Sequence, residues 1–170
     1  GLGLAHGLAD AGADIAVVGR NETKSAAAVA DLKARGVKAI SVVTDVTDKA
    51  AVAAMIDRVV KELGRIDILI NNAGMSIRKP PHELELDEWN KVIDTNLTSA
   101  FVIGREAARR MIPRKHGKII NIGSLGSELA RPTIAPYTAA KGGIKNLTRS
   151  MAVEWAQHGI NANAIGPGYM

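Results

Sequence analysis

Tyr137 and Lys141 stand four residues apart in the segment Pro-Tyr-Thr-Ala-Ala-Lys, and Ser124 lies thirteen positions before the tyrosine. If the segment is helical, the phenol and the amine lie one above the other on one helix face. An ordinary tyrosine titrates near pH ~10, so proton exchange at neutral pH requires a shift of about three pKa units, or roughly 4 kcal/mol. One unit charge at ~4 Å in an effective dielectric of ~20 supplies about that much. The three residues therefore have the chemistry of a proton-transfer site.

The same three residues also have a purely structural interpretation. Tyrosine and lysine at helical spacing are often a half-buried ring beside a solvated amine, and Ser124 could be an ordinary turn residue. The spacing alone leaves both interpretations open, so the choice depends on the rest of the chain.

The composition favours a core built from small aliphatic side chains. Hydrophobic residues make up 46% of the 170 residues, but only five are Phe, Trp or Tyr. Cores of Ala, Val, Ile and Leu suit parallel strands that are covered by helices. The chain has no cysteine, which excludes a disulfide framework and a thiolate metal site, and we expect no metal.

Charge and hydropathy point away from nucleic acids and membranes. The net charge is +5, but the cations are scattered through helical patterns, and there are too few aromatic residues to stack on bases. No apolar run approaches the length of a membrane span, and nothing resembles a signal peptide. We expect a cytoplasmic protein that binds neither nucleic acid nor membrane.

Short apolar runs alternate with longer helical patterns along the chain. The runs at 14–18, 38–43, 66–70, 118–122 and 160–165 predict strands. The segments 22–35, 48–63, 87–112 and 137–157 predict helices, and a further helical pattern covers 4–10. Glycines follow four of these helices, where a left-handed cap is expected: Gly36, Gly64, Gly117 and Gly159. This alternation predicts an α/β fold, a Rossmann-type doubly wound parallel sheet with helices on both faces, in a single domain spanning 1–170.

Both ends of the chain predict that it is an excerpt of a longer protein. Gly1-Leu2-Gly3 opens directly into a helical pattern, without the strand that should precede such glycines in a nucleotide-binding fold. At the other end, the chain stops immediately after the strand at 160–165. We therefore expect a first strand and a C-terminal helix and strand to be absent, and we expect the 170 residues alone to be inactive.

Taken together, the motifs resemble those of the short-chain dehydrogenase/reductase family. They occur in the family's order and spacing across essentially the whole chain: Gly1-Leu2-Gly3, Asp45-Val46, Asn71-Asn72-Ala73-Gly74, Asn96, Ser124, Tyr137-x-x-x-Lys141 and Pro167-Gly168. The combination is specific, whereas a lone glycine pair would be weak evidence.

The resemblance implies a set of residues that bind a dinucleotide cofactor. Gly1, Leu2 and Gly3 would belong to the phosphate turn, where a helix N-terminus faces the pyrophosphate. Asp45 and Val46 would meet the adenine, unless Asp45 merely belongs to the start of the next helix, as Asp48 does. The remaining positions that the resemblance assigns to the cofactor are Asn72, Ala73, Gly74, Tyr137, Lys141, Pro167 and Gly168.

The end of the second strand in this fold selects between NAD and NADP. An acidic residue there accepts from the ribose 2′-hydroxyl, whereas an arginine accommodates a 2′-phosphate. Here Gly19 stands where an acid would repel phosphate, and Arg20 and Asn21 follow. An exposed arginine at a strand end can also be simply solvated, but the missing carboxylate favours NADP over NAD.

The resemblance also implies a role for each candidate catalytic residue. Tyr137 would be the general acid and base, and Lys141 would lower its pKa and hold the nicotinamide ribose. Ser124 would hydrogen-bond the substrate oxygen. Asn96 would hold a water of the proton relay, although it could instead be a polar break in a long helix.

Two stretches, 124–137 and 166–170, resemble the gluconate 5-dehydrogenase branch of the family. A sugar acid needs a cation for its carboxylate, which Arg78 or Arg131 could provide, and Glu128 could accept hydrogen bonds from hydroxyls. These residues could equally be solvent-facing loop charges. A 2-deoxy-D-gluconate 3-dehydrogenase, a 3-oxoacyl reductase and a catalytically silent nucleotide-binding relative remain alternatives. The resemblance further implies a homotetramer or homodimer formed through the helices at 87–112 and 137–157.

Overall fold

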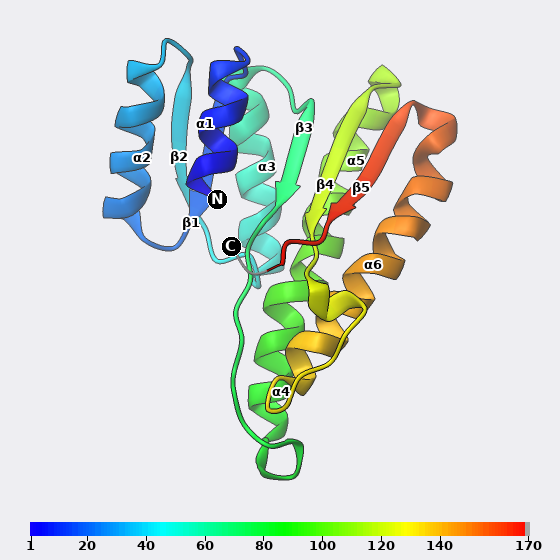
Figure 1. Ribbon diagram of the computed structural model, residues 1–170. Coiled ribbons are helices and arrows are strands. Elements are labelled where there is room, and N and C mark those ends of the chain that lie inside the picture. Colours follow the sequence, from blue (N-terminus) through cyan, green and yellow to red (C-terminus); the bar gives the residue numbers. More distant parts are fainter. Residues whose placement is uncertain (169–170) are drawn as a thin grey trace. The chain divides into compact units, whose positions relative to one another are not determined.

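The computed structural model describes residues 1–168 (Figure 1). The described residues fall into two compact units, one spanning residues 1–65 and the other beginning at residue 66. Each unit combines parallel strands with helices, as the α/β prediction requires. Among the described residues, no helix is both long and apolar enough to cross a membrane.

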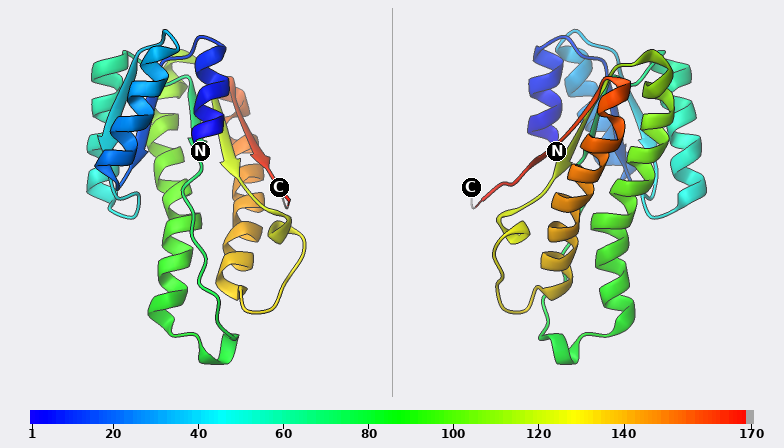
Figure 2. Two further views of the ribbon diagram at one scale, coloured as in Figure 1. Left: turned by 60° about the vertical axis from the view of Figure 1, so that its left-hand side comes forward. Right: turned by 90° about the vertical axis from the view of Figure 1, so that its right-hand side faces the viewer.

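The first unit is a two-stranded parallel sheet with helices on both faces. Its elements are α1 (Leu2–Asp10), β1 (Ile15–Gly19), α2 (Glu22–Ala34), β2 (Ala39–Val43) and α3 (Lys49–Leu63). Strands β1 and β2 pair from Ile15 opposite Ala39 to Gly19 opposite Val43. Helices α1 and α2 lie on one face and α3 lies on the other (Figure 2). The small core of this unit contains Ala9, Ile15, Leu32 and Ala39.

Side-chain caps fix where the helices of the first unit begin. The Asn21 side chain accepts a hydrogen bond from the Lys24 backbone at the start of α2. Asp48 accepts from Ala50 and Ala51 at the start of α3, which confirms its predicted capping role.

The second unit is a three-stranded parallel sheet in the order β3-β4-β5. Its main elements are β3 (Ile68–Asn71), α4 (Leu86–Ile93), α5 (Ser99–Met111), β4 (Gly117–Ile122), α6 (Ala135–Trp155) and β5 (Ile160–Ile165). Helices α5 and α6 lie side by side against one face of this sheet (Figure 2), as right-handed crossovers between neighbouring strands require. The carboxyl ends of the three strands therefore lie at one edge of the sheet.

Two details of the second unit differ from the sequence prediction. The helix expected over 87–112 is interrupted by a π-helical segment, Asp94–Thr98, between α4 and α5. Gly117 is not a left-handed cap: Lys115 takes that conformation, with φ 50°. Gly117 instead opens β4 directly against Met111, whose side chain fills the space that a Cβ would need. The other three predicted caps, Gly36, Gly64 and Gly159, do have positive φ.

Candidate active site

The first turns of α6 bring Tyr137 and Lys141 together. The Lys141 Nζ lies 5.6 Å from the centroid of the Tyr137 ring, and only 5% of Lys141 is exposed. Its amine donates a hydrogen bond of 2.5 Å to the carbonyl of Ile122, at the end of β4. Burial lowers the pKa of Lys141 below the usual lysine value. The amine is therefore a partly desolvated cation held beside the phenol.

Ser124 follows β4 and lies near the same tyrosine. Its Oγ accepts the Gly126 backbone N–H at 3.0 Å, which leaves the hydroxyl proton free to donate to another group. A Cβ on Gly126 would lie 3.5 Å from both the Ser124 Oγ and the Tyr137 Cε1. The serine hydroxyl and the edge of the ring thus border the same small residue, so Ser124, Tyr137 and Lys141 form one group.

Asn96 lies in the π-helical segment and is almost fully buried, with 2% of its surface exposed. Its Oδ1 accepts the backbone N–H of Met75 at 3.2 Å. Its Nδ2 donates to the carbonyls of Met75 and Val92, both at 2.8 Å. Both amide hydrogens are used, so this side chain fastens the segment after β3 to the helix. Its relay role remains a prediction.

Gly74 is the point at which Asn96 and Lys141 meet. A Cβ at this position would lie 2.7 Å from the Asn96 Oδ1 and 3.8 Å from the Lys141 Nζ. The first contact is closer than real side chains allow, so the local packing requires a glycine. All four predicted catalytic residues therefore lie in the second unit, around Gly74 and Gly126.

A buried chain of polar side chains runs beneath the site from β3 to α6. Asn71 donates to the Asn121 Oδ1 at 2.8 Å, directly across the β3–β4 register. Asn121 donates to the Thr148 Oγ1 at 2.9 Å, and Thr148 donates to the Ile144 carbonyl at 2.7 Å. Sequence reasoning missed Asn121 and Thr148. The available signal was an asparagine inside the apolar strand 118–122, because a buried amide needs partners.

The three predicted substrate residues are all exposed. The backbone N–H of Lys79 donates to the Thr133 carbonyl at 2.9 Å, so the loops carrying Arg78 and Arg131 run side by side. Thr133 adopts φ 67°, which is rare for a β-branched residue. Glu128 forms an ion pair with Lys145 of α6. The roles of these three residues in substrate binding remain predictions.

Within the first unit, the predicted nucleotide residues lie at helix starts and strand ends. Helix α1 begins after Gly1 without a side-chain cap, and its first turn has no acidic residue, which suits an anion. The Arg20 guanidinium lies 3.7 Å from the Asp45 carboxylate. Hydrogen bonds from the Thr47 backbone and hydroxyl, and then the charge of Arg20, lower the pKa of Asp45.

Several other predicted cofactor residues are small, exposed to solvent, or both. Asn72, Ala73 and Gly74 are exposed directly after β3. The Pro167 carbonyl accepts the Leu125 backbone N–H at 3.1 Å, which places the Pro167-Gly168 segment beside the turn that follows Ser124. In the first unit, Leu2 is about half exposed, Val46 is half-buried, and the Asn21 side chain is used by the α2 cap.

Comparisons with known proteins agree with this arrangement. The family model for short chain dehydrogenases matches residues 1–170. The chain is 48% identical to gluconate 5-dehydrogenase of Gluconobacter oxydans (strain 621H) over 169 residues, covering 99% of this chain and 66% of that protein. It is 43% identical over 170 residues to 2-dehydro-3-deoxy-D-gluconate 5-dehydrogenase of Formosa agariphila, covering 99% of this chain and 64% of that protein.

A solved structure is similar at the level of the fold as well as the sequence. A gluconate 5-dehydrogenase from Burkholderia cenocepacia J2315, in complex with NADP and tartrate, matches with a TM-score of 0.93 and 47% identity, over 99% of this chain and 67% of that one. The chain thus spans 66% and 64% of the length of the two curated relatives above.

Proposed function

This chain belongs to the short-chain dehydrogenase family, and we propose that the whole protein is an NAD(P)-dependent oxidoreductase that interconverts a secondary alcohol and a ketone. The observation that carries this proposal is the buried Lys141 amine, 5.6 Å from the Tyr137 ring centroid. Burying a cation costs free energy. The position of this buried cation beside a phenol supports a chemical role for it.

In the proposed reaction, each side chain acts on the substrate oxygen or on the proton that it exchanges. Ser124 donates its free hydroxyl proton to the carbonyl oxygen and stabilises the charge that develops there. Tyr137 gives its proton to that oxygen in reduction and accepts it in oxidation. Lys141 stabilises negative charge on the phenol oxygen through its ammonium group. A bound nicotinamide supplies or accepts the hydride.

The residues present fit a dinucleotide cofactor. We assign the pyrophosphate to the uncapped start of α1 at Gly1, Leu2 and Gly3. Arg20 directly follows β1, its side chain is largely exposed, and its guanidinium lies 3.7 Å from the Asp45 carboxylate. Its guanidinium supports a preference for NADP over NAD, since it can bind a 2′-phosphate.

For the substrate, we propose the pair D-gluconate and 5-keto-D-gluconate. The support is the similarity to gluconate 5-dehydrogenases and the presence of Arg78 and Arg131 in adjacent loops, since a carboxylate substrate needs a cation. The relative from Formosa agariphila favours 2-dehydro-3-deoxy-D-gluconate as a second candidate. Both are sugar acids, so they share the requirement for a cation.

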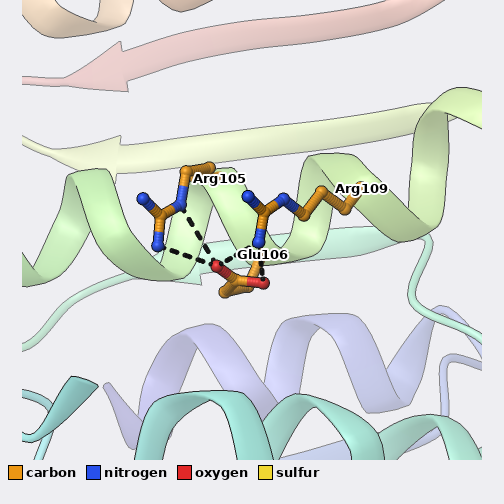
Figure 3. Close-up of polar contacts among 3 residues, drawn as sticks. All are labelled: Arg105, Glu106 and Arg109. Atoms are coloured by element: carbon orange, nitrogen blue, oxygen red, sulfur yellow. Dashed lines mark hydrogen bonds and ion pairs between the residues drawn. The ribbon is translucent and has the colours of Figure 1, made fainter. Parts of the chain in front are cut away.

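We propose that the protein assembles as a homotetramer or homodimer through α5 and α6. Phe101 on α5 is 45% exposed, and the Arg105 guanidinium lies over its ring at 5.7 Å. Glu106 accepts hydrogen bonds of 2.9 Å from both Arg105 and Arg109 (Figure 3). Burial alone would raise the pKa of Glu106, but these two guanidinium groups lower it below its usual value. An exposed aromatic ring beside an ordered charge cluster supports an interface.

The proposed activity is tested in the whole protein in two directions. NADPH oxidation is measured with 5-keto-D-gluconate, which is a ketone at C5, and NADP reduction is measured with 2-dehydro-3-deoxy-D-gluconate, which is an alcohol at C5. A Tyr137→Phe variant keeps the ring but loses the proton, so its kcat should fall by about 10²- to 10⁴-fold. NADPH binding, followed by fluorescence, should remain because the ring is retained. Equal kcat values in the two proteins would remove Tyr137 from the mechanism, and no turnover of any ketone would favour a non-catalytic nucleotide-binding protein.

A further inference from the structure

One hydroxyl joins the backbone of Ser124 to the backbone of Lys141. The Ser127 Oγ donates to the Lys141 carbonyl at 2.8 Å and accepts the Ser124 N–H at 3.3 Å. A serine hydroxyl has a single proton. That proton is donated to the Lys141 carbonyl on the helix, while a lone pair of the same oxygen accepts the Ser124 N–H on the loop. The orientation of the Ser127 hydroxyl is therefore fixed by the two residues that it connects.

Gly123 and β5 pack closely around the turn that carries this hydroxyl. Ser127 ends the short turn Leu125–Ser127, which follows Ser124. A Cβ on Gly123 would lie 3.3 Å from the Ser127 Oγ and 3.2 Å from the Ile165 carbonyl. The Gly123 N–H donates to that same carbonyl at 2.7 Å. The turn is thus held against β5 on one side and against α6 on the other.

A second contact ties the same turn to the next turn of the helix. Glu128, directly after Ser127, forms an ion pair with Lys145, four residues beyond Lys141. The Glu128 side chain is 60% exposed, and exposed ion pairs contribute little to stability. The hydrogen bonds of Ser127 are therefore the stronger candidates for setting the distance between the loop and the helix.

We propose that Ser127 is a positioning residue, which holds the Ser124 hydroxyl in line with Tyr137 by connecting the Ser124 loop to α6 at Lys141. This inference rests on the proposed function, in which Ser124 and Tyr137 act on the same substrate oxygen. Ser127 touches no reacting atom. Its effect is geometric, and a misplacement of about 1 Å can cost on the order of 10²-fold in rate.

The test uses three variants of the whole protein. Ser127→Ala removes the hydroxyl, Ser127→Thr keeps it, and Ser127→Cys replaces it by a weak donor of similar shape. We expect kcat to fall by about 10- to 100-fold in the Ala and Cys variants, and to stay within a few-fold of the wild type in the Thr variant. NADPH affinity should be unchanged in all three. Ser150→Ala, an exposed serine of α6, is the matched control and should keep wild-type kcat.

A second measurement does not depend on turnover. Loss of the acceptor at Ser127 should speed hydrogen exchange of the Ser124 amide in the Ala variant, and the Thr variant should restore protection. A folded Ser127→Ala protein with wild-type kcat and wild-type exchange would overturn the proposal. If Ser127→Ala does not fold, equal kcat values in the Thr and Cys variants would overturn it. Failure of the proposed function itself would appear separately, as full activity in Tyr137→Phe.

Discussion

The side-chain amide of Asn96 pairs with both backbone polar groups of Met75, accepting its N–H at 3.2 Å and donating to its carbonyl at 2.8 Å. Such a pair reproduces the contact that a neighbouring strand would make. It anchors the segment after β3 to the helix, at the point where the helix becomes π-helical. π-Helical turns inside α-helices are rare, and those that do occur are often found at functional sites. Here the π turn presents the amide that fixes Gly74 beside Lys141.

Gly74→Ala tests this packing, because the new Cβ would lie 2.7 Å from the Asn96 Oδ1. The amide must move away from Met75, so we expect a loss of about 1–3 kcal/mol of stability from overpacking, together with reduced kcat. Urea unfolding and steady-state kinetics measure the two effects. Gly7→Ala is the control: no atom lies within 4 Å of its Cβ position, and alanine should stabilise the helix by about 0.5–1 kcal/mol. Unchanged stability in Gly74→Ala would contradict the packing described.

Thr148→Val tests the buried chain of polar groups beneath the site. Valine has the shape of threonine but cannot accept the hydrogen bond from the Asn121 Nδ2, which is completely buried. An unsatisfied buried donor should cost about 1–3 kcal/mol, measured by urea unfolding. Thr23→Val, at an exposed position of α2, controls for the change in residue type. Equal effects in the two variants would show that the Asn121–Thr148 hydrogen bond contributes nothing.

The lowered pKa of Lys141 predicts a pH dependence of stability. Burial lowers this pKa in the folded protein, so the unfolded chain binds the proton more tightly. Between the folded pKa and the unfolded value of about 10.4, the contribution of Lys141 to stability should therefore rise with pH. Below that window both states carry the proton, and the penalty for burying the charge is fully present.

The measurement compares the thermal midpoints of the wild type and of Lys141→Met across the alkaline range, without nucleotide. The thermal midpoint of the wild type should rise relative to that of the variant as the pH increases. Lys91→Met, an exposed lysine of α4, controls for general loss of a positive charge. A difference between wild type and Lys141→Met that does not change with pH would count against a buried ammonium.

Arg20→Ala tests the cofactor preference. If the guanidinium binds a 2′-phosphate, kcat/KM for NADPH should fall by about 10- to 100-fold, as expected for loss of a charge-assisted hydrogen bond. The value for NADH should change little, because NADH lacks that phosphate. Arg20→Lys should lie in between, since it keeps the charge without the planar fork. An equal fall for both nucleotides would instead assign Arg20 to general nucleotide binding or to its contact with Asp45.

The sequence predicted the element types well, because hydrophobic periodicity and the residues that cap or end an element are local properties of the chain. Each predicted strand is present within a few residues of its predicted bounds, and the Asp48 cap and the glycines at 36, 64 and 159 were correct. Gly117 was misassigned because a glycine is needed there for lack of space and not for a left-handed backbone conformation. The lack of space comes from the Met111 side chain, and a contact between two elements leaves no mark in the local pattern.

The candidate catalytic group was predicted from resemblance and spacing, and the structure brings its members together. The π turn was not predicted, because hydrophobic periodicity over 87–112 does not distinguish a continuous helix from one with a single extra residue. Ser127 was missed for a similar reason. Its partners are backbone groups of Ser124 and Lys141, and a residue of any type carries such groups, so the sequence shows no pattern for this contact.

The π-helical segment also constrains which insertions and deletions this chain can tolerate. Removing one residue from Asp94–Thr98 would restore an uninterrupted α-helix, but each residue of such a helix advances by about 100°. Everything from Ser99 onward would then turn relative to α4, and the buried residues Ala100, Ile103 and Ala107 would rotate out of the core. A substitution in this segment changes the contacts of one side chain, whereas a change in the length of the segment would reorient the whole of α5.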